Sequence, residues 1–148
     1  MIRNLAKSDY ARVIEIWERA VRATHHFLNE EDILQYRKLI YNKYLDLVEL
    51  YGFVDEKGVL SGFIGISGEA IQLLFVDANR RGMGVGKQLV AYAVQEKGSK
   101  TVDVNEQNEQ AVHFYEHLGF VTTGRSPVDD AGKPYPILSM ELKDRKGV

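Results

Sequence analysis

Three glycines at alternate positions form the clearest chemical signal in the sequence. Gly82, Gly84 and Gly86 lie in the segment RRGMGVGKQLV (81–91), which leads from a β-rich stretch directly into a helical pattern. The first N–H groups of a helix have no acceptor within the helix, and the helix dipole places positive charge there. Glycine also lets an anion approach the backbone closely. The segment therefore predicts a phosphate-binding turn, although a glycine-rich turn that only begins a helix would have the same pattern.

Two common phosphate-binding loops do not fit this spacing. A P-loop requires glycine five positions before the glycine of Gly-Lys-Ser/Thr, where this chain has Arg81, and Lys87 is followed by Gln88. The dinucleotide pattern Gly-x-Gly-x-x-Gly would need glycine in place of Lys87 or Leu89. Asp103 follows at about the distance of a ribose-binding acid, but the strands before it form a meander rather than a Rossmann unit. Both nucleotide-binding loops are therefore excluded.

The elements around the glycines are typical of one mixed α/β (α+β) domain, which we expect to cover residues 1–148. The first half of the chain predicts a short strand in MIRNL, helices over 8–24 (N-cap Ser8 or Asp9) and 29–47, and strands over 48–54, 59–67 and 70–76. The second half predicts a helix from 85 to about Gly98, a strand over 101–104, and a helix over 108–120 capped by Asn108. A strand over 135–142 and a frayed tail in KDRKGV follow. The helix between 70–76 and 101–104 implies that those two strands are parallel.

Composition narrows the class of protein. The 148 residues are 45% hydrophobic and 27% charged, with a formal net charge of −2 and a pI near 6.1. These values are ordinary for a globular domain, and we expect no basic face that would bind nucleic acid. The absence of cysteine excludes disulfides, thiolate metal sites and cysteine nucleophiles. Because there is neither a signal-peptide pattern nor an apolar run long enough to span a membrane, we expect a soluble cytoplasmic protein.

The segment HFYEH (113–117) has two interpretations. It matches the His-x-x-Glu-His motif of some zinc proteases, and His113 and His117 fall on one helical face as metal ligands would. That face is opposite the apolar stripe, and the residues that follow predict no further helix to supply a third ligand, so two solvent-facing histidines are the simpler prediction. Tyr115 lies on the stripe with Phe114 and Leu118, which by itself predicts a core aromatic residue.

Two ordered segments resemble the cofactor-binding motifs of the GNAT N-acetyltransferase superfamily. LLFVDANRRGMGVGKQLV is similar to its pyrophosphate loop, Arg/Gln-x-x-Gly-x-Gly/Ala, with Arg81, Gly84 and Gly86 at the defining positions. NEQNEQAVHFYEHLGF resembles the second cofactor segment, and ATHHFLNEEDI and TGRSPVDDAGKPYPIL are similar to stretches of the YjaB-like acetyltransferases. The resemblance covers nearly the whole chain. It implies a mixed sheet with an antiparallel N-terminal meander, splayed parallel central strands and about four flanking helices.

The resemblance also implies acetyl-CoA as co-substrate and no metal. Backbone groups of Phe75 and Val76 would bind the pantetheine arm in the gap between the parallel strands and face the thioester carbonyl. The diphosphate would be held by the loop residues Arg81, Gly82, Met83, Gly84, Val85, Gly86 and Lys87. Asn108 would bind the cofactor from the other side, and Phe114 would pack beside it.

Acetyl transfer from a thioester to an amine sets further requirements. An amine with a pKa of about 10.4 is almost entirely protonated at pH 7, so a base, or a site that lowers the amine's pKa, promotes attack. The tetrahedral intermediate needs an oxyanion donor such as a strand N–H, and the departing thiolate needs a proton. The resemblance assigns that last role to Tyr115. His25 and His26, in the connection between the first two helices, are candidate bases or packing residues.

The residues on the acceptor side are less well defined. Phe27, Glu31 and Tyr135 are candidates for acceptor binding, and the acids Glu30, Glu31, Asp32, Asp129 and Asp130 would either attract a cationic amine or solvate the surface. We expect transfer by direct attack in a ternary complex, either to protein lysine or to a small-molecule amine. A homodimer is compatible with the family. The alternative is a non-catalytic acyl-CoA-binding sensor or interaction module.

Overall fold

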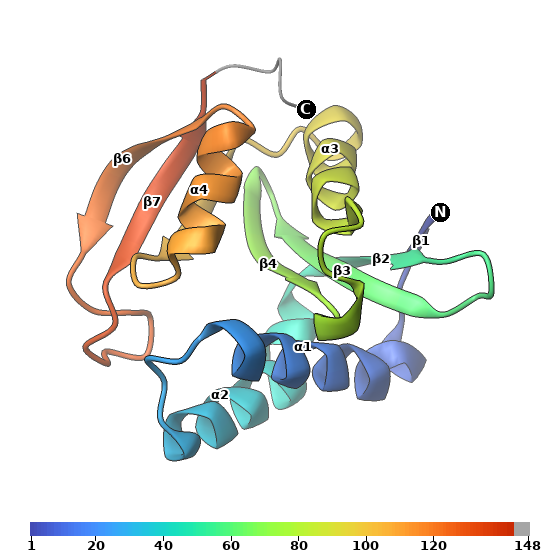
Figure 1. Cartoon of the computed structure of the whole chain (residues 1–148), viewed down its shortest axis with the longest axis horizontal. Coiled ribbons are helices and arrows are strands. Elements are labelled where there is room, and N and C mark those ends of the chain that lie inside the picture. The colour runs from blue at the N-terminus through green and yellow to red at the C-terminus, as the bar shows by residue number, and fades with distance from the viewer. Residues whose placement is uncertain (144–148) are drawn as a thin grey trace.

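The computed structural model describes residues 1–143, which form a mixed sheet flanked by helices (Figure 1); the tail expected at 144–148 lies outside the described residues. The strands are β1 (Ile2–Asn4), β2 (Glu49–Val54), β3 (Leu60–Ser67), β4 (Ala70–Val76), β5 (Thr101–Asn105), β6 (Phe120–Ser126) and β7 (Ile137–Leu142). The helices are α1 (Tyr10–Thr24), α2 (Glu30–Asn42), α3 (Val85–Lys97) and α4 (Glu109–His117), with 3-10 turns η1 (Lys7–Asp9), η2 (Tyr44–Leu47) and η3 (Ala78–Arg80). The strand order is β1-β2-β3-β4-β5-β7-β6. Only the central pair, β4 and β5, is parallel among these strands, as the helical crossover predicted.

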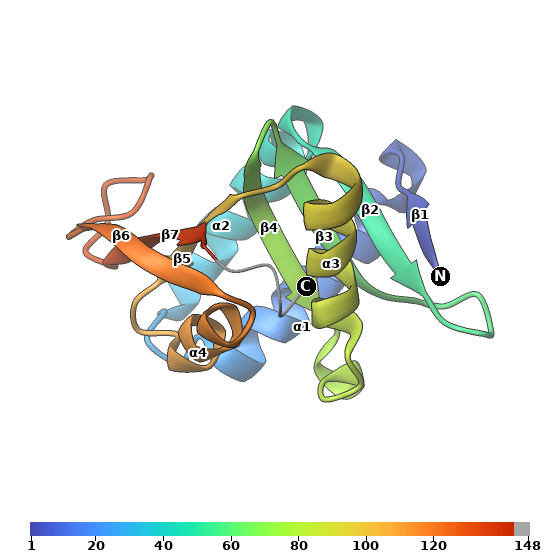
Figure 2. The same cartoon turned by 90° about the horizontal axis from the view of Figure 1, so that it is seen from above.

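Helices cover both faces of the sheet (Figures 1 and 2). A separate hydrophobic core lies on each face. On one face, α1 contributes Val13 and Trp17 to a core that includes Phe63 of β3. On the other face, α3 contributes Leu89 to a core that includes Ile64 of the same strand. Phe63 and Ile64 serve different cores because successive strand residues point to opposite faces of a sheet. The expected mixed α/β architecture is therefore confirmed.

β4 and β5 separate soon after they begin to pair (Figure 2). Their parallel pairing joins 70–71 to 101–102. Where β4 pairs with β3, the register shifts between Gly65 and Ile66, which leaves Gln72 as an extra residue in β4. A bulge bends the strand that carries it. We attribute the separation of the two strands to this bend, which produces the splayed parallel pair that the family resemblance implied.

One strand was not predicted from the sequence. β6 has a single buried residue, Phe120, and the residues after it are mostly polar and exposed. It therefore lacks the alternating apolar pattern by which a half-buried strand is recognised. Pairing with β7 along most of its length defines the strand instead. The resulting hairpin carries a loop, 127–136, that is important for the site described below.

The helix boundaries differ from expectation in three places, one of which is the end of α4 at His117 rather than at 120. Asp9 is the N-cap residue of α1, but its carboxylate accepts a hydrogen bond from the preceding Ala6 N–H at 2.9 Å rather than from the helix. The second helix ends at Asn42, and the remainder of the predicted range becomes η2. Asn108 caps α4 as predicted. No helix within residues 1–143 is long and apolar enough to cross a membrane.

Candidate active site between the splayed strands

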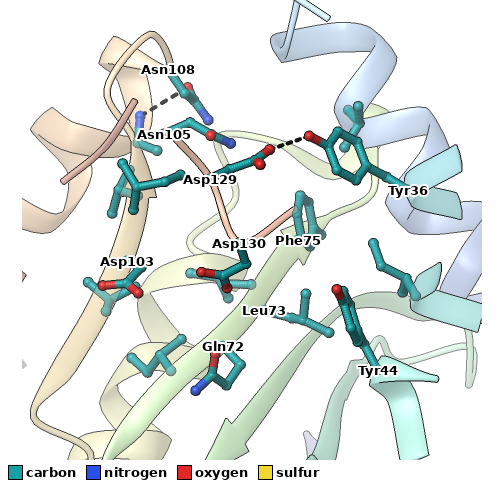
Figure 3. A pocket seen from close by; sticks show the side chains of 18 of the residues that line it. Tyr36, Tyr44, Gln72, Leu73, Phe75, Asp103, Asn105, Asn108, Asp129 and Asp130 are labelled. Carbon is teal, nitrogen blue, oxygen red and sulfur yellow. Dashed lines mark hydrogen bonds between the residues drawn. The ribbon is translucent and has the colours of Figure 1, made fainter. Parts of the chain in front are cut away.

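A cavity of about 540 Å³ opens where β4 and β5 separate (Figure 3). Its walls come from segments far apart in the sequence: α1, α2, β4, β5, α4 and the β6–β7 loop. Figure 3 shows Leu73 and Phe75 on β4, and Asp103 and Asn105 on β5. The parallel pairing of β4 with β5 ends at Ile71. The edge of β4 beyond this point therefore presents backbone N–H and C=O groups to which an extended ligand can bind.

The backbone conformation of the loop before α3 requires two of its glycines. Gly82 and Gly84 have φ values of +80° and +79°, in the left-handed region that strains residues with a Cβ. A Cβ added to either would meet no heavy atom of the described chain within 4 Å. Their conformation, rather than crowding by the protein, therefore makes glycine necessary.

The same loop begins α3 with uncapped N–H groups. Gly84 is the N-cap residue and has no side chain to accept from the helix, and the first helical bond runs from Gln88 N–H to Gly84 C=O at 3.0 Å. The N–H groups of 85–87 precede that bond, so within the described chain they have no helical acceptor. The side chains of Met83 and Lys87 are exposed, whereas that of Val85 is buried in the core. An exposed helix start of this kind fits a diphosphate.

The third glycine lies where α3 meets its neighbours. A Cβ on Gly86 would lie 3.4 Å from the Phe114 ring and 3.6 Å from Val76 Cγ2, both at contact distance. Phe114 in turn contacts Tyr115 edge-on, with 5.1 Å between ring centroids. The fold thus brings together predicted cofactor residues from β4, α3 and α4.

A buried carboxylate that the sequence did not single out fixes the start of this loop. Asp77 directly follows β4 and is 1% exposed. Its Oδ2 accepts a hydrogen bond from Arg12 at 2.8 Å, and Arg19 Nε lies 3.3 Å from its Oδ1. Its backbone N–H donates to Ser61 C=O, and its C=O accepts from Arg80 N–H, both at 2.8 Å. Two arginines of α1 therefore hold this end of β4, because a buried charge needs close partners.

Asn108, before α4, and Arg81, in the loop before α3, lie close to one another beside the cleft. Asn108 lines the cavity, and its Oδ1 accepts from the Ala111 N–H at 3.3 Å, which leaves the NH₂ group of its amide to bind a ligand. Arg81 donates a hydrogen bond to Gln110 Oε1 in the first turn of α4. The loop before α3 and the start of α4 therefore touch across the gap.

Tyr115 lies both in the hydrophobic core and at the wall of the cavity. It is 5% exposed and packs edge-on against Phe120, with 5.4 Å between ring centroids, so it is a core residue. It also lines the cavity. Burial raises its pKa above the ordinary value for tyrosine, so the phenol keeps its proton at neutral pH. A protonated hydroxyl at the cavity wall is able to act as an acid.

The two candidate histidines lie in different places. His25 is 7% exposed, lines the cavity, and has its Nδ1 2.7 Å from Thr24 Oγ1. His26 is exposed and lines a smaller hollow of about 230 Å³ beside Arg81 and Asn108. The fold therefore places His25 in the wall of the main cavity and His26 beside the cofactor loop.

Two tyrosine–aspartate pairs join α2 to the β6–β7 loop. Tyr36 of α2 donates to Asp129 of the loop (Figure 3), and Tyr135 of the loop donates to Asp32 of α2. Lys133 Nζ lies 3.0 Å from Asp32 Oδ1. The Tyr135 and Lys133 partners lower the pKa of Asp32, and the Asp32 hydrogen bond raises the pKa of Tyr135 to about 12. We call these reciprocal contacts the clasp; they close the acceptor side of the cavity.

The other residues predicted on the acceptor side lie in different places. Phe27 packs against the Tyr135 ring, with centroids 5.8 Å apart, and so lies beside the clasp. Glu31 is exposed and does not line the cavity. Glu30 pairs with Arg22, at 2.6 Å between Oε2 and Nη1. Of these residues the structure brings Phe27 and Tyr135 together and leaves Glu31 and Glu30 outside.

Two carboxylates in the cavity have no partner within the described chain. Asp103 of β5 and Asp130 of the β6–β7 loop both line it, and neither carboxylate makes a hydrogen bond or ion pair with residues 1–143 (Figure 3). The sequence suggested Asp130 as one of several acids, but considered Asp103 only as a ribose ligand. Its alternation with the buried Val102 and Val104 was the available signal, because it places Asp103 on the opposite face of β5.

The His-x-x-Glu-His segment shows no metal-binding geometry in the described residues. His113 and His117 are exposed on α4. Among residues 1–143 no group of three or more histidine, cysteine, aspartate or glutamate side chains is placed to hold a metal ion.

The fold and the cleft agree with comparisons to known proteins. The model of the acetyltransferase (GNAT) domain family matches residues 19–142. The peptidyl-lysine N-acetyltransferase YjaB of Escherichia coli K12 is 42% identical over 139 residues, which cover 94% of each chain. The solution structure of the apo form of YjaB from Escherichia coli superposes with a TM-score of 0.88 over 96% of each chain. The PaiA N-acetyltransferase of Thermoplasma acidophilum, crystallised with coenzyme A, shares the fold at 23% identity, with a TM-score of 0.76 over 97% of this chain and 98% of that one.

The separation of β4 from β5 and the glycine loop before α3 are the features of an acyl-CoA-dependent transferase with a GNAT fold. The chain belongs to the GNAT acetyltransferase family. It is an acetyl-CoA-dependent N-acetyltransferase similar to YjaB. The free edge of β4 and the uncapped start of α3 fit the pantetheine arm and the diphosphate of that co-substrate, respectively.

Proposed function

We propose that the protein transfers the acetyl group of acetyl-CoA to the ε-amine of lysine in other proteins. The observation that carries this proposal is the cavity itself, which combines a backbone edge for the thioester with the carboxylates of Asp103 on β5 and Asp130 on the β6–β7 loop. Unpaired carboxylates attract a cationic lysine side chain. The name of the YjaB relative supports the same acceptor class.

The cofactor half of the proposal uses mostly backbone groups. Phe75 and Val76 offer their backbone to the pantetheine arm, and the loop from Arg81 to Lys87 offers its N–H groups to the diphosphate. Asn108 binds the arm from the α4 side, and Phe114 packs beside it. Acetyl-CoA supplies the acetyl group as a thioester, and an N–H of β4 stabilises the oxyanion that forms during attack.

The shape of the cavity supports direct attack in a ternary complex. The cleft between β4 and β5 is continuous with the space lined by α1, α2 and the clasp, so the thioester and the amine share one cavity. The buried, protonated Tyr115 donates its proton to the departing thiolate. A base on the acceptor side takes the proton from the amine, and His25 and His26 are the candidates from the sequence.

The test is mass spectrometry combined with thiol detection. The purified protein is incubated with isotopically labelled acetyl-CoA and a cell lysate, and the labelled products are digested and mapped. We expect label on lysine ε-amines and an equal release of free thiol. Label only on small amines would replace protein lysine with another acceptor. Binding of coenzyme A without thiol release for any acceptor would favour the acyl-CoA sensor.

Three further parts of the proposal rest on the sequence. We propose that residues 1–148 fold as one domain, that the enzyme acts in the cytoplasm, and that a homodimer is compatible with its fold. Cell fractionation and light scattering of the full chain test the last two, and cooperative two-state unfolding tests the first.

A further inference from the structure

His25 is held in one orientation at the cavity wall. Its backbone N–H bonds to Val21 C=O at 2.7 Å, which completes the last turn of α1. Its ring packs between two phenylalanines, with centroids 5.3 Å from Phe27 and 6.3 Å from Phe75. Phe75 belongs to the β4 segment that faces the cleft. The imidazole therefore lies between the acceptor wall and the strand that binds the thioester.

A neighbouring hydroxyl determines which ring nitrogen carries the hydrogen. Thr24 Oγ1 donates its single hydrogen to Ala20 C=O at 2.8 Å. With that hydrogen used, the oxygen can only accept in its 2.7 Å contact with His25 Nδ1. We therefore assign a hydrogen to His25 Nδ1, since the other tautomer would take the Thr24 hydrogen away from Ala20 C=O. In the neutral ring the other nitrogen, Nε2, is then an unprotonated acceptor.

The surroundings favour this neutral form. Burial lowers the pKa of His25 to about 4, and the adjacent His26 adds a smaller effect in the same direction. Within residues 1–143, Nε2 has no hydrogen-bond partner, although the residue lines the cavity. A buried imidazole with an unused acceptor nitrogen at a substrate cavity is poised to bind a donor.

We infer that His25 Nε2 accepts a hydrogen bond from the acceptor amine and takes its proton during attack; this rests on the proposed function. The cationic acceptor first loses one proton to solvent, and the neutral amine nitrogen then forms a bond to the thioester carbon as the carbonyl electrons move to oxygen. One N–H proton passes to Nε2 as the positive charge on nitrogen makes that proton acidic. The C=O bond then re-forms, the C–S bond breaks, and the thiolate takes the proton of Tyr115. Water carries the proton from His25 back to the Tyr115 oxygen, so the site is restored.

The other polar groups in or beside the cavity are less suited to this role. The carboxylates of Asp32 and Asp129 are occupied by the clasp tyrosines. Asp103 and Asp130 are exposed, and their charge serves to attract the cationic form of the acceptor. His26 lines the separate hollow beside the cofactor loop. His25 alone among these side chains combines burial, a fixed ring and an unused acceptor.

The first test measures the tautomer without measuring activity. Nitrogen-15 NMR of the full-length protein at pH 7 distinguishes a protonated ring nitrogen from an unprotonated one. We expect the neutral His25 ring with hydrogen on Nδ1, and a Thr24→Val variant that loses this fixed preference. A ring protonated on Nε2, or a charged ring at pH 7, would overturn the inference.

The second test uses a peptide with blocked termini and one free lysine. His25→Phe preserves the aromatic packing but removes both nitrogens, and we expect kcat to fall on the order of 100-fold, with the dissociation constant of acetyl-CoA unchanged within about twofold. Thr24→Val should lower kcat by roughly tenfold, and Thr24→Ser, which keeps the hydroxyl, should restore most of it. His117→Gln on the exposed face of α4 is the matched histidine control and should leave kcat unchanged.

The outcomes separate this inference from the proposed function. If the wild-type protein acetylates no lysine peptide but does acetylate a small amine, the acceptor class fails, and the same variants are measured with that amine. If the wild type is active and His25→Phe retains its kcat while it binds acetyl-CoA normally, the role of His25 is disproved. Equal loss in Thr24→Val and Thr24→Ser would also contradict it.

Discussion

The two halves of the cleft are built by different means. On the cofactor side we propose recognition by backbone groups: the free edge of β4 and the uncapped N–H groups at the start of α3. On the acceptor side we propose recognition by side chains from α1, α2, β5 and the β6–β7 loop, of which α2 and the loop are joined by the clasp. Backbone recognition is indifferent to most side chains but demands glycine where φ is positive. Side-chain recognition changes with each substitution, so we expect this half to determine which amine is acetylated.

The largest expected effect lies where the two halves meet, at Tyr115. Tyr115→Phe keeps the ring contacts with Phe114 and Phe120 but removes the only proton that the residue can donate. Loss of a general acid typically costs 10²–10⁴-fold, and we expect kcat to fall by about 100-fold at saturating acetyl-CoA. Tyr92→Phe, in the same hydrophobic core, is the control and should be neutral. Steady-state kinetics check this, and an unaltered kcat would remove Tyr115 from the reaction.

Two glycines with the same backbone conformation test whether the cofactor half of the cleft binds through its backbone. Gly84 at the start of α3 and Gly58 in the β2–β3 turn have φ of +79° and +80°, and neither would crowd a Cβ. Valine at either position should cost about 1–2 kcal/mol of unfolding free energy. Only Gly84→Val should also weaken acetyl-CoA binding, by about 30-fold, which is about 2 kcal/mol. Calorimetric titration that found equal affinity in both variants would separate the loop from the diphosphate.

Removing negative charge should weaken binding of the acceptor and leave binding of acetyl-CoA unchanged. Asp103→Asn combined with Asp130→Asn removes the two unpaired carboxylates, and we expect KM for a lysine peptide to rise by about tenfold, about 1.4 kcal/mol, with acetyl-CoA affinity preserved. Added salt should weaken the wild type more than the variant, because screening acts on charge. Glu56→Gln in the β2–β3 turn is the matched control. A rise in KM for acetyl-CoA instead would mean that these acids serve the cofactor side.

The smallest effect is a dependence of stability on pH that His25 introduces. Its pKa lies at about 4 in the folded protein and at the ordinary value of 6.5 when unfolded, so the unfolded chain binds more protons between these values. Stability therefore falls as pH decreases through this window, by up to about 1 kcal/mol from pH 7 to pH 6. The difference in unfolding free energy between the wild type and His25→Phe, measured with denaturant at each pH, gives the contribution of His25. A difference that does not change between pH 7 and 6 would contradict the buried, neutral ring.

The contrast between the halves also explains what could be predicted from the sequence. The glycine spacing, the Asn108 cap and the order of β2, β3 and β4 are local patterns, and the fold confirmed them. The loop before α3 could be predicted from its glycines, because a backbone conformation with positive φ favours glycine over the other residues.

The parts that were missed depend on long-range contacts. β6 is defined by its pairing with β7 and has one buried residue, so its own pattern carries little signal. The clasp joins residues 93 and 103 positions apart. The buried Asp77 is indistinguishable in sequence from an exposed acid until α1 supplies Arg12 and Arg19. Contacts between distant segments have no local periodicity from which to predict them.

The central claim is that both halves of the cleft act together to move an acetyl group from acetyl-CoA to lysine. The most direct measurement is the stoichiometry of one reaction, in which released thiol and ε-acetyl-lysine are quantified together from a blocked peptide with a single lysine. The account predicts one thiol for each acetylated ε-amine, and neither product from the Tyr115→Phe variant above a few per cent of the wild-type rate. Binding of acetyl-CoA with no thiol released across a panel of amines would contradict it.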